Sequence, residues 1–570
     1  MEGKIEGNAN RSGRYAIYGM NRVAKGFIYI FDDLKVSRIY DDAPECEEWN
    51  GFPVLDIQSY SKESGRLILC GYDKREKEEK MNALGYKYEK DYLREEDFFS
   101  LLDDGIDIPQ DKEIVVWGTG QMAAIFMEKG KKFPIKYFLD SYTQKKKFYG
   151  LKVMRPDEVN SWNGLFVIIA AVDDREIKNS LLEKHLVEGK DFISYRNVMY
   201  DCPRMLRETL FSEEVYDFTC DTTLNHLEVA MGGKTVCCCS TFLDEEMGSI
   251  LEKGVSGVWN SAMHKILCLS TQNRTYTFCK RDMCPYFINK TPRLVEEKED
   301  WEYKKMKSRP EVLAIGYDKT CNLRCETCRK ELHIAGEQEA AAAHAVGELV
   351  RKELLPGCRF FILAGNGEVF ASKAYAEAYE SGESAEIPYI RILSNGTLFN
   401  PVNWKRFKQN KSGKIMVTFS IDAASKNTYE DIRRGGNFDI VQKNMEYAAE
   451  LRRKGELAYF RMNFVVQKKN YMEMPEFVRW GEELGADEVF FTKILNWGTF
   501  TEEEFREVSM MGEDGITPKP ELEEVLQNPV MKHRIVDLGT IRYSHEAVEG
   551  NEFHNYYMWE LERKVPELFE

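Results

Sequence analysis

Residues 312–330 read VLAIGYDKTCNLRCETCRK, an apolar strand followed by a polar loop that carries three cysteines. Cys321, Cys325 and Cys328 are separated by three and by two residues. At this spacing, three thiolates on one loop can converge on three corners of a 4Fe-4S cube, which leaves the fourth iron free to bind another molecule. A structural zinc site would normally need a fourth ligand nearby, and no fourth cysteine is close in the sequence.

From residue 312 onward, apolar strands alternate with amphipathic stretches. The predicted strands are VLAIGY (312–317), RFFIL (359–363), YIRILS (389–394), IMVTFSI (415–421), YFRMNFVV (459–466) and EVFFT (488–492). Six βα units in sequence predict a parallel sheet with helices outside it, closed or partly closed into a (β/α)6 barrel. In such a barrel the chemistry lies at the carboxyl ends of the strands.

Polar residues follow three further strands of this series. They are Asn366, Gly367 and Glu368 after the second strand, Ser394 and Asn395 at the third, Ser420 and Asp422 at the fourth, and then Arg433. Together with CNLRCETC after the first strand, these stretches resemble the radical S-adenosylmethionine (SAM) superfamily. The resemblance covers about residues 310–500.

This resemblance implies a chemistry and a set of cofactor contacts. In that family the open iron chelates the amino and carboxylate groups of SAM, and an electron from the reduced cluster cleaves SAM to a 5′-deoxyadenosyl radical that abstracts hydrogen from substrate. The implied SAM contacts are Asn366, Gly367 and Glu368 (amino group), Ser394 and Asn395, Ser420 and Asp422 (ribose), and Arg433 (carboxylate). The sequence departs from the family in two places, with Asn366 at a usual glycine and Thr327 where many members have an aromatic residue.

The first two hundred residues contain an internal repeat. Residues 15–24 (YAIYGMNRVA) and 114–123 (IVVWGTGQMA) share a pattern of strand, glycine turn and helix start, and Asp41 and Asp140 follow at a nearly constant offset. This order is typical of dinucleotide-binding folds, in which glycines let the backbone approach phosphate.

The two copies resemble the small Rossmann-like sugar-nucleotide-binding domains that precede some sugar-modifying enzymes. Gly118 and Gly120 in the second copy are the candidate nucleotide contacts, whereas the first copy has Asn21 in place of the second glycine. The alternative is a scaffold that binds no ligand.

A second group of cysteines lies upstream of the first motif. Cys220, Cys238, Cys279 and Cys284, with Gly233 between the first two, resemble the SPASM or twitch auxiliary-cluster domain, which usually follows a radical SAM barrel and here precedes it. The resemblance implies a second, fully ligated 4Fe-4S cluster suited to electron transfer. Zinc is the alternative for four thiolates.

The triple cysteine at 237–239 leaves the second ligand open. Gly232 with Cys237 satisfies the spacing as well as Gly233 with Cys238, and we favour Cys238 because it then begins a Cys-Cys pair. Five other cysteines are predicted to be ordinary buried thiols: Cys46, Cys70, Cys202, Cys268 and Cys358.

Composition limits the class of protein. The 570 residues are 43% apolar and 31% charged, with a formal net charge of −16, which indicates a globular multidomain chain and argues against nucleic-acid binding through a broad basic face. The apolar stretch 164–172 is too short to span a membrane, and the first residues contain no apolar signal region, so we expect a cytoplasmic protein without a membrane partner.

These patterns predict an α/β protein with five parts. They are Rossmann-like repeat 1 (1–108), Rossmann-like repeat 2 (109–205), a SPASM/twitch-like auxiliary domain (206–300), the radical SAM core barrel (301–500) and a C-terminal tail packing on the barrel (501–570).

The predicted function is a radical SAM oxidoreductase that abstracts hydrogen from a sugar, a sugar nucleotide or a similar polar substrate. The auxiliary cluster would accept the remaining electron, giving dehydrogenation, or support epimerisation. The resemblance also implies a low-potential electron donor, a ferredoxin or a flavodoxin. A peptide-modifying (RiPP-type) radical SAM enzyme and a non-catalytic iron–sulfur/SAM-binding protein are the alternatives.

Overall fold

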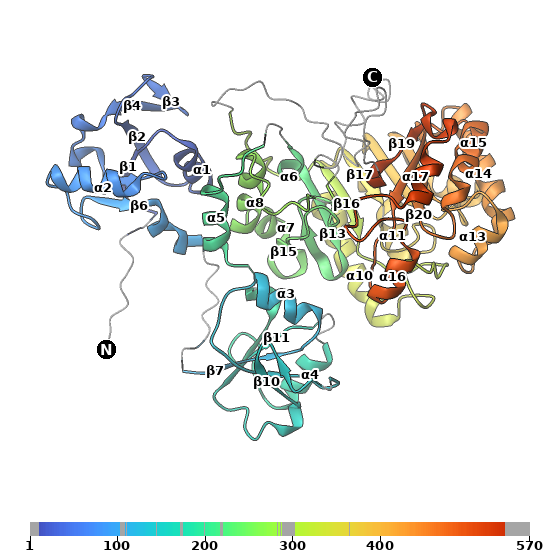
Figure 1. Cartoon of the computed structure of the whole chain (residues 1–570), viewed down its shortest axis with the longest axis horizontal. Helices are drawn as coiled ribbons and strands as arrows, with labels where there is room; N and C mark the ends of the chain where they lie inside the picture. The colour runs from blue at the N-terminus through green and yellow to red at the C-terminus, as the bar shows by residue number, and fades with distance from the viewer. Residues whose placement is uncertain are drawn as a thin grey trace. The chain divides into compact units, whose positions relative to one another are not determined.

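The computed structural model describes most of the chain. The described residues are 9, 11–102, 109, 111–143, 145–171, 175–198, 200–216, 220–281, 283–284, 287, 302–363 and 365–541. The chain divides into two compact units, residues 1–215 and 216–570. Figure 1 labels the helices and strands of both. Among the described residues, no helix combines the length and the apolar character needed to cross a membrane.

The first unit contains two six-stranded sheets. The first sheet has the order β3-β4-β2-β1-β5-β6, formed by β1 (Arg14–Tyr18), β2 (Lys35–Asp41), β3 (Glu48–Trp49), β4 (Phe52–Asp56), β5 (Arg66–Leu69) and β6 (Tyr92–Arg94). The second has the order β12-β11-β7-β8-β10-β9, formed by β7 (Glu113–Trp117), β8 (Ile135–Leu139), β9 (Lys147–Phe148), β10 (Leu151–Met154), β11 (Leu165–Ile169) and β12 (Phe192–Ser194).

The two sheets have the same strand order when one is read in reverse, as expected for two copies of one unit. In each sheet the first strand lies centrally between parallel neighbours, and a hairpin (β3–β4 or β9–β10) forms one edge. Helices follow the strands: α1 (Arg22–Ile30), α2 (Lys74–Ala83), α3 (Gln121–Lys129), α4 (Arg175–Glu183) and α5 (Cys202–Leu210). Strand β7 is buried on both faces, since Ile114 and Val116 belong to one apolar cluster and Val115 and Trp117 to another.

The second unit is built on one ten-stranded sheet. Its order is β15-β14-β13-β16-β17-β18-β19-β20-β21-β22. The strands are β13 (His226–Ala230), β14 (Lys234–Val236), β15 (Gly248–Ser249), β16 (Val312–Gly316), β17 (Phe360–Leu363), β18 (Tyr389–Ser394), β19 (Lys414–Ser420), β20 (Tyr459–Val466), β21 (Glu488–Lys493) and β22 (Val536–Asp537). All neighbours from β13 to β22 are parallel, and β14 and β15 add an antiparallel edge.

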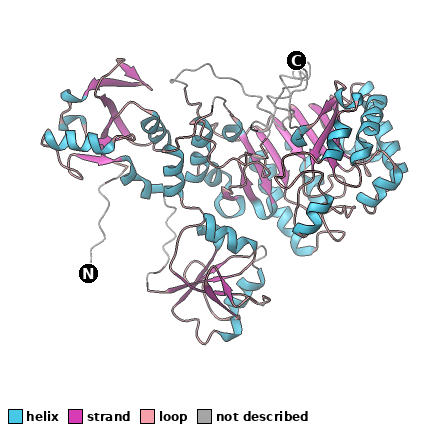
Figure 2. Cartoon of the chain, viewed as in Figure 1, coloured by secondary structure: helices cyan, strands magenta, loops and turns pink. Residues whose placement is uncertain are grey.

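Helices separate the strands of this unit, and Figure 2 shows them beside the sheet. They are α6 (Thr222–Asn225), α7 (Ile250–Trp259), α8 (Ala262–Gln272), α10 (Glu337–Leu349), α11 (Lys373–Tyr379), α12 (Pro401–Lys408), α13 (Lys426–Ile432), α14 (Phe438–Arg453), α15 (Met474–Leu484), α16 (Glu502–Val508) and α17 (Pro520–Leu526). Local sequence explains their ends. The Asn400 and Asn437 side chains cap α12 and α14, and Gly485 ends α15 in a left-handed conformation.

The six predicted strands correspond to β16–β21, and the α/β class is confirmed. Two parallel strands were not predicted. Strand β13 pairs with β16, so the segment 206–300 contributes to the same sheet as the core. Strand β22 pairs with β21, so part of the predicted tail also joins the sheet, whereas residues 542–570 lie outside the described residues.

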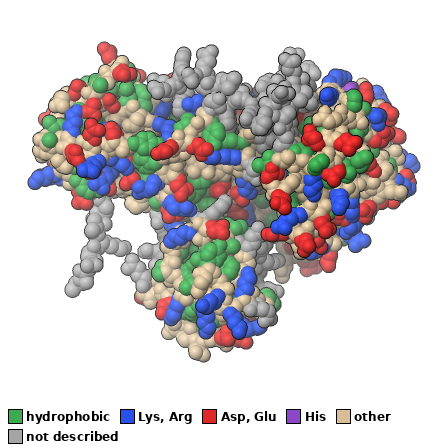
Figure 3. Space-filling model, viewed as in Figure 1, with side chains coloured by type: hydrophobic (Ala, Val, Ile, Leu, Met, Phe, Trp, Pro, Cys, Tyr) green, Lys and Arg blue, Asp and Glu red, His purple; other side chains and the backbone are tan. Residues whose placement is uncertain are grey.

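The surface carries charges of both signs. On the face shown in Figure 3, acidic and basic side chains are interspersed. This agrees with the acidic composition, which argues against a broad basic surface.

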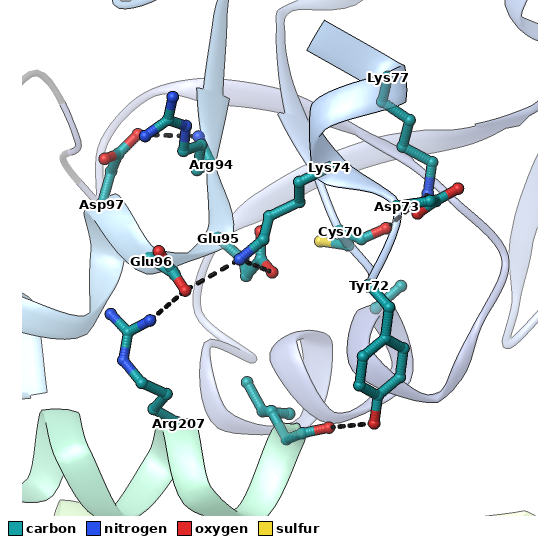
Figure 4. Close-up of polar contacts among 12 residues, drawn as sticks. Cys70, Tyr72, Asp73, Lys74, Lys77, Arg94, Glu95, Glu96, Asp97 and Arg207 are labelled. Carbon is teal, nitrogen blue, oxygen red and sulfur yellow. Dashed lines mark hydrogen bonds and ion pairs between the residues drawn. The ribbon is translucent and has the colours of Figure 1, made fainter. Parts of the chain in front are cut away.

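A buried carboxyl group lies between the first sheet and α5 (Figure 4). Glu95, the residue after β6, is fully buried, and the Lys74 ammonium lies 3.2 Å from its Oε1. The same ammonium lies 2.9 Å from Glu96 Oε1, which also pairs with Arg207 of α5. Burial raises the pKa of Glu95 to about 7. Although burial acts upward on Glu96 too, Lys74 and Arg207 hold the pKa of Glu96 below its ordinary value.

We expect the raised pKa of Glu95 to make the stability of the first unit decrease with pH. Because the pKa of Glu95 is higher in the folded than in the unfolded chain, the folded state binds more protons between about pH 4.5 and 7, and its stability falls across that window as pH rises. A shift of this size corresponds to about 3 kcal/mol. Glu95→Gln should therefore raise the melting temperature of the first unit at pH 8 and have little effect at pH 4.5, as measured by calorimetry of the full chain.

The matched control is Glu96→Gln. Its carboxylate is stabilised in the folded state, so this change should lower the melting temperature at pH 8. Equal effects of the two substitutions at pH 8 would contradict the assignment.

Candidate active site

The three cysteines of the first motif lie on the loop that leaves the carboxyl end of β16. Cys321 and Cys325 are buried, whereas Cys328 is exposed. Backbone hydrogen bonds hold the loop, from Cys321 N to His333 O (2.9 Å) and from Cys328 N to Cys325 O (3.0 Å). The loop therefore has a defined shape, with one of its thiols toward solvent.

The turn after β17 packs directly against this loop. Glu368 N donates to Thr320 O (2.9 Å), and a Cβ on Gly367 would lie 2.5 Å from the same oxygen. Only glycine allows this close approach. The Asn366 side chain donates to Gly316 O at the end of β16 (2.7 Å), so the residue that departs from the family pattern also ties the turn to the first strand.

The Glu368 carboxylate links the turn after β17 to the end of β18. It is buried and accepts hydrogen bonds from Ser394 Oγ (2.8 Å) and from Asn395 N (2.7 Å). Burial raises the pKa of Glu368, and these two donors oppose the rise. The Asn395 amide in turn donates to Asn322 Oδ1 (2.9 Å) and lies 3.9 Å from Cys321 Sγ. Residues predicted from separate motifs thus meet in one network beside the first cysteine.

The fourth strand contributes a buried ion pair. Asp422 follows β19 with φ at +64°, and its Oδ2 lies 2.5 Å from Arg433 Nη2. Its Oδ1 accepts from Val465 N (2.8 Å). Burial raises the pKa of Asp422, and Arg433 opposes that rise. Arg433 Nη1 is also 3.6 Å from Cys325 Sγ, while Ser420 is partly exposed at the end of β19.

Two fully buried side chains, and Arg433 of the pair itself, have buried polar atoms without a hydrogen-bond partner among the described residues. They are Tyr429 Oη, Arg433 Nε and both amide atoms of Gln467. Gln467 follows β20 and shares the strand parity of Arg461 and Asn463. Unpaired buried polar groups are costly and indicate a missing polar partner, so this side of the site fits a polar cofactor such as SAM. Neither Tyr429 nor Gln467 was predicted, because only three-dimensional proximity singles them out.

The upstream cysteines lie at the opposite end of the sheet. Strand β14 runs antiparallel to β13, and Val236 pairs with Glu228, so the chain after Val236 returns toward the amino end of β13. The His226 side chain, at that end, interacts with the backbone of Cys237. Because β13 and β16 are parallel over five residues of about 3.3 Å each, this site is roughly 15 Å or more from the loop after β16.

The structure brings Cys237 close to the other upstream cysteines. Cys237 and Cys238 form a bend after β14, and Cys239 has no regular secondary structure. Burial raises the pKa of Cys279, and four nearby acidic groups raise it further: Cys284, Cys220, Glu245 and Cys237. Cys237 thus joins the group, beside the predicted ligands. Of the five predicted buried thiols, Cys46 is exposed, which makes that prediction wrong, and the other four are buried.

In the second sheet of the first unit, Asp140 hydrogen-bonds the glycine turn at residues 118–120. A Cβ on Gly118 would lie 2.2 Å from Ala170 O, and φ is +130°, so glycine is required there. Gly120 caps α3 in open space. Asp140 Oδ2 accepts from Thr119 N (3.0 Å) and Thr119 Oγ1 (2.6 Å). The Asp140 carboxylate therefore accepts one backbone N–H of this turn, that of Thr119.

Among the residues that the structure describes, no three histidine, cysteine, aspartate or glutamate side chains surround one point as ligands of a single metal ion. A 4Fe-4S cube presents several irons to its cysteines, so its ligands stand farther apart. At the loop after β16 each thiol has a nearby N–H donor: Asn395 for Cys321, Arg433 for Cys325 and Arg329 for Cys328. This donor set fits a cluster that carries negative charge.

Comparison with known proteins identifies the domain. Residues 319–481 match the family described as the Radical SAM superfamily, so the chain contains a radical SAM domain, as the cysteine motif predicted. Such a domain implies a 4Fe-4S cluster and SAM.

Three proteins with different names are similar to parts of this chain. A probable GTP 3′,8-cyclase of Methanococcus maripaludis is 26% identical over 29% of this chain and 53% of its own length. A tungsten-containing aldehyde ferredoxin oxidoreductase cofactor-modifying protein of Pyrococcus furiosus is 25% identical over 43% of this chain and 73% of its own. The solved structure of Streptococcus suis SuiB bound to precursor peptide SuiA is 18% identical to this chain in sequence. The matched region covers 31% of this chain and 38% of the SuiB chain, with a TM-score of 0.24. The chain spans about half the length of the cyclases it matches.

Proposed function

We propose that this chain is a radical SAM oxidoreductase that takes a hydrogen atom from a sugar, a sugar nucleotide or a similar polar substrate. The observation that carries the proposal is the loop after β16, where each of three thiols lies 3.4, 3.6 or 3.9 Å from a side-chain N–H donor. Such donors stabilise iron-bound thiolates and influence the cluster potential. The three cysteines would hold the cluster, and SAM bound beside it would supply the radical that removes the hydrogen atom.

The chain's own residues would bind and orient SAM at the carboxyl edge of the sheet. Glu368 holds Ser394 and Asn395 in place through its buried carboxylate. The unpaired atoms of Tyr429 and Gln467 are available to hydrogen-bond the bound molecule. Their burial keeps water away from the reacting groups.

Two features favour a nucleotide-linked substrate. The relatives named GTP 3′,8-cyclase act, by their name, on a nucleotide. The first unit contributes two sheets with glycine turns, and we propose that the turn with Gly118 and Gly120 binds a nucleotide or sugar nucleotide at the start of α3. A peptide-modifying enzyme and a non-catalytic SAM-binding protein are the alternatives.

We further propose that the upstream cysteines hold an auxiliary 4Fe-4S cluster. Its ligands would be Cys220, Cys279, Cys284 and either Cys237 or Cys238. At roughly 15 Å from the first loop by strand length, this cluster would exchange electrons without touching the substrate. After loss of the hydrogen atom, the substrate would lose one electron to this cluster and one proton to solvent, giving dehydrogenation, whereas return of a hydrogen atom would give epimerisation. A ferredoxin or flavodoxin would supply electrons to the enzyme.

The first test is iron and labile sulfide per chain after anaerobic reconstitution. We expect about eight irons, for two four-iron clusters. Cys237→Ala and Cys238→Ala form a matched pair of variants. The variant that lacks the true ligand should lose about four irons per chain, whereas the other should retain about eight. About four irons in the parent, unchanged in both variants, would contradict the auxiliary cluster.

The same preparation tests the substrate class. With excess reductant, 5′-deoxyadenosine formation should rise when sugar nucleotides are added and not when peptides are added. A rise with peptides alone would favour the peptide-modifying alternative. Absence of SAM cleavage in a preparation with its full iron content would favour the non-catalytic one.

A further inference from the structure

Arg329, the residue after the third cysteine, connects three segments of the active site. Its Nη1 donates to Lys319 O (2.7 Å), which precedes the first cysteine. Its Nη2 donates to Asn366 O (2.6 Å), on the turn after β17, and lies 3.4 Å from Cys328 Sγ. One guanidinium thus joins both ends of the cysteine loop to the neighbouring turn.

Asn366 completes this connection from the other side. Its side-chain amide donates to Gly316 O (2.7 Å) while its own carbonyl accepts from Arg329. The glycine that usually occupies this position in the family could supply the carbonyl but not the side-chain bond. Arg329 and Asn366 together therefore form a latch between the end of β16, the cysteine loop and the turn after β17.

The contact with Cys328 has an electrostatic consequence. Cys328 is the exposed thiol of the three. Its N···S distance to Arg329 is the shortest of the three N–H···S contacts. Uptake of one electron makes a cluster more negative, so a fixed guanidinium hydrogen-bonded to a ligand sulfur favours the reduced form. Arginine suits this place because its planar fork can serve several acceptors and stays charged.

We propose that Arg329 is a positioning residue that fixes Cys328 against the Asn366 turn and raises the reduction potential of the cluster. The inference rests on the proposed function, because it needs a cluster on the three cysteines. The redox step involves one electron, supplied in the test by dithionite, and no bond in the protein is formed or broken.

The test compares Arg329→Gln with Arg324→Gln in the full-length reconstituted protein, without SAM. Arg324 is exposed on the same loop, and its side chain has no hydrogen bond or ion pair with any described residue. Both changes remove one positive charge, but only the first removes an N–H···S contact. In a dithionite titration followed by electron paramagnetic resonance, Arg329→Gln should shift the potential of the SAM-binding cluster to a more negative value than Arg324→Gln does. Equal shifts would overturn the proposal.

A charge-conserving pair protects the test if the glutamine variant fails to assemble its cluster. Arg329→Lys keeps the charge but cannot reach all three acceptors, so it should still shift the potential and should release iron to a chelator about tenfold faster, as for other residues that support metal ligands. Arg324→Lys should change neither. A parent-like potential in Arg329→Lys would overturn the proposal, whereas a parent without cluster signals would refute the proposed function itself.

The latch also predicts non-additivity. Asn366→Gly should accelerate iron release in the parent and add little in Arg329→Lys, because both substitutions break the same connection. Fully additive effects would show that the two residues act independently and would contradict the latch.

Discussion

Replacement of Cys325 by alanine should eliminate the SAM-binding cluster and lower 5′-deoxyadenosine formation by more than ~100-fold, since loss of residues that merely support metal ligands already costs about 10–100-fold. Cys325 is buried in the loop after β16, and its sulfur lies near Arg433 Nη1. Without this thiolate the remaining two cysteines cannot hold a four-iron cube on the loop. Iron analysis should show a loss of about four irons per chain.

The matched control is Cys358→Ala. Cys358 is also a buried thiol of the second unit, but its sulfur contacts Glu311 O (3.7 Å), just before the start of β16. This variant should retain its iron and its SAM cleavage, with a loss of stability of about 1 kcal/mol, typical of a small change in the core. Retained iron and cleavage in Cys325→Ala would show that the cluster lies elsewhere.

The second large effect should come from Arg433→Leu. Asp422 is 2% exposed and loses its ion-pair partner in this variant, which leaves a buried charge without compensation. Breaking such a pair typically costs about 3–5 kcal/mol. We expect the free energy of unfolding of the second unit to fall by that amount at pH 8, as measured by urea denaturation. The loss should be smaller at pH 4, because Asp422 is protonated more easily once Arg433 is gone.

Arg434→Leu provides the comparison. The neighbouring arginine is 45% exposed and pairs with Glu326, which also has Lys469 at 2.8 Å. A partly solvated pair with a second cation should contribute less than about 1 kcal/mol. Similar losses in the two variants would mean that the Asp422–Arg433 pair is no more stabilising than a surface contact.

Several features of the site could be predicted because they depend on local spacing. The three cysteines lie within eight consecutive residues, so any loop conformation keeps them close together. The strands β16–β21 are recognisable as apolar runs of the right length. Since parallel strands present their carboxyl ends at one edge, the polar residues after each strand could be assigned to one site.

Other features could not be predicted from local patterns. Strand β22 is two residues long, and β13 lies in a segment that the cysteine motif assigned to a separate domain. Strand β22 belongs to the main sheet because it pairs with β21, and β13 because it pairs with β16, which begins more than 80 residues later in the chain.

By itself, the sequence predicted a radical SAM domain at the first cysteine loop and the α/β succession that supports it, because both follow from the spacing of residues along the chain. Only the tertiary structure decided that the second cysteine group lies at the amino end of the sheet, that Arg433 pairs with Asp422, and that Arg329 reaches Asn366. These relations depend on strand register and on contacts between distant segments. A single sequence carries no periodic signal for such contacts, since they arise only when packing brings the segments together.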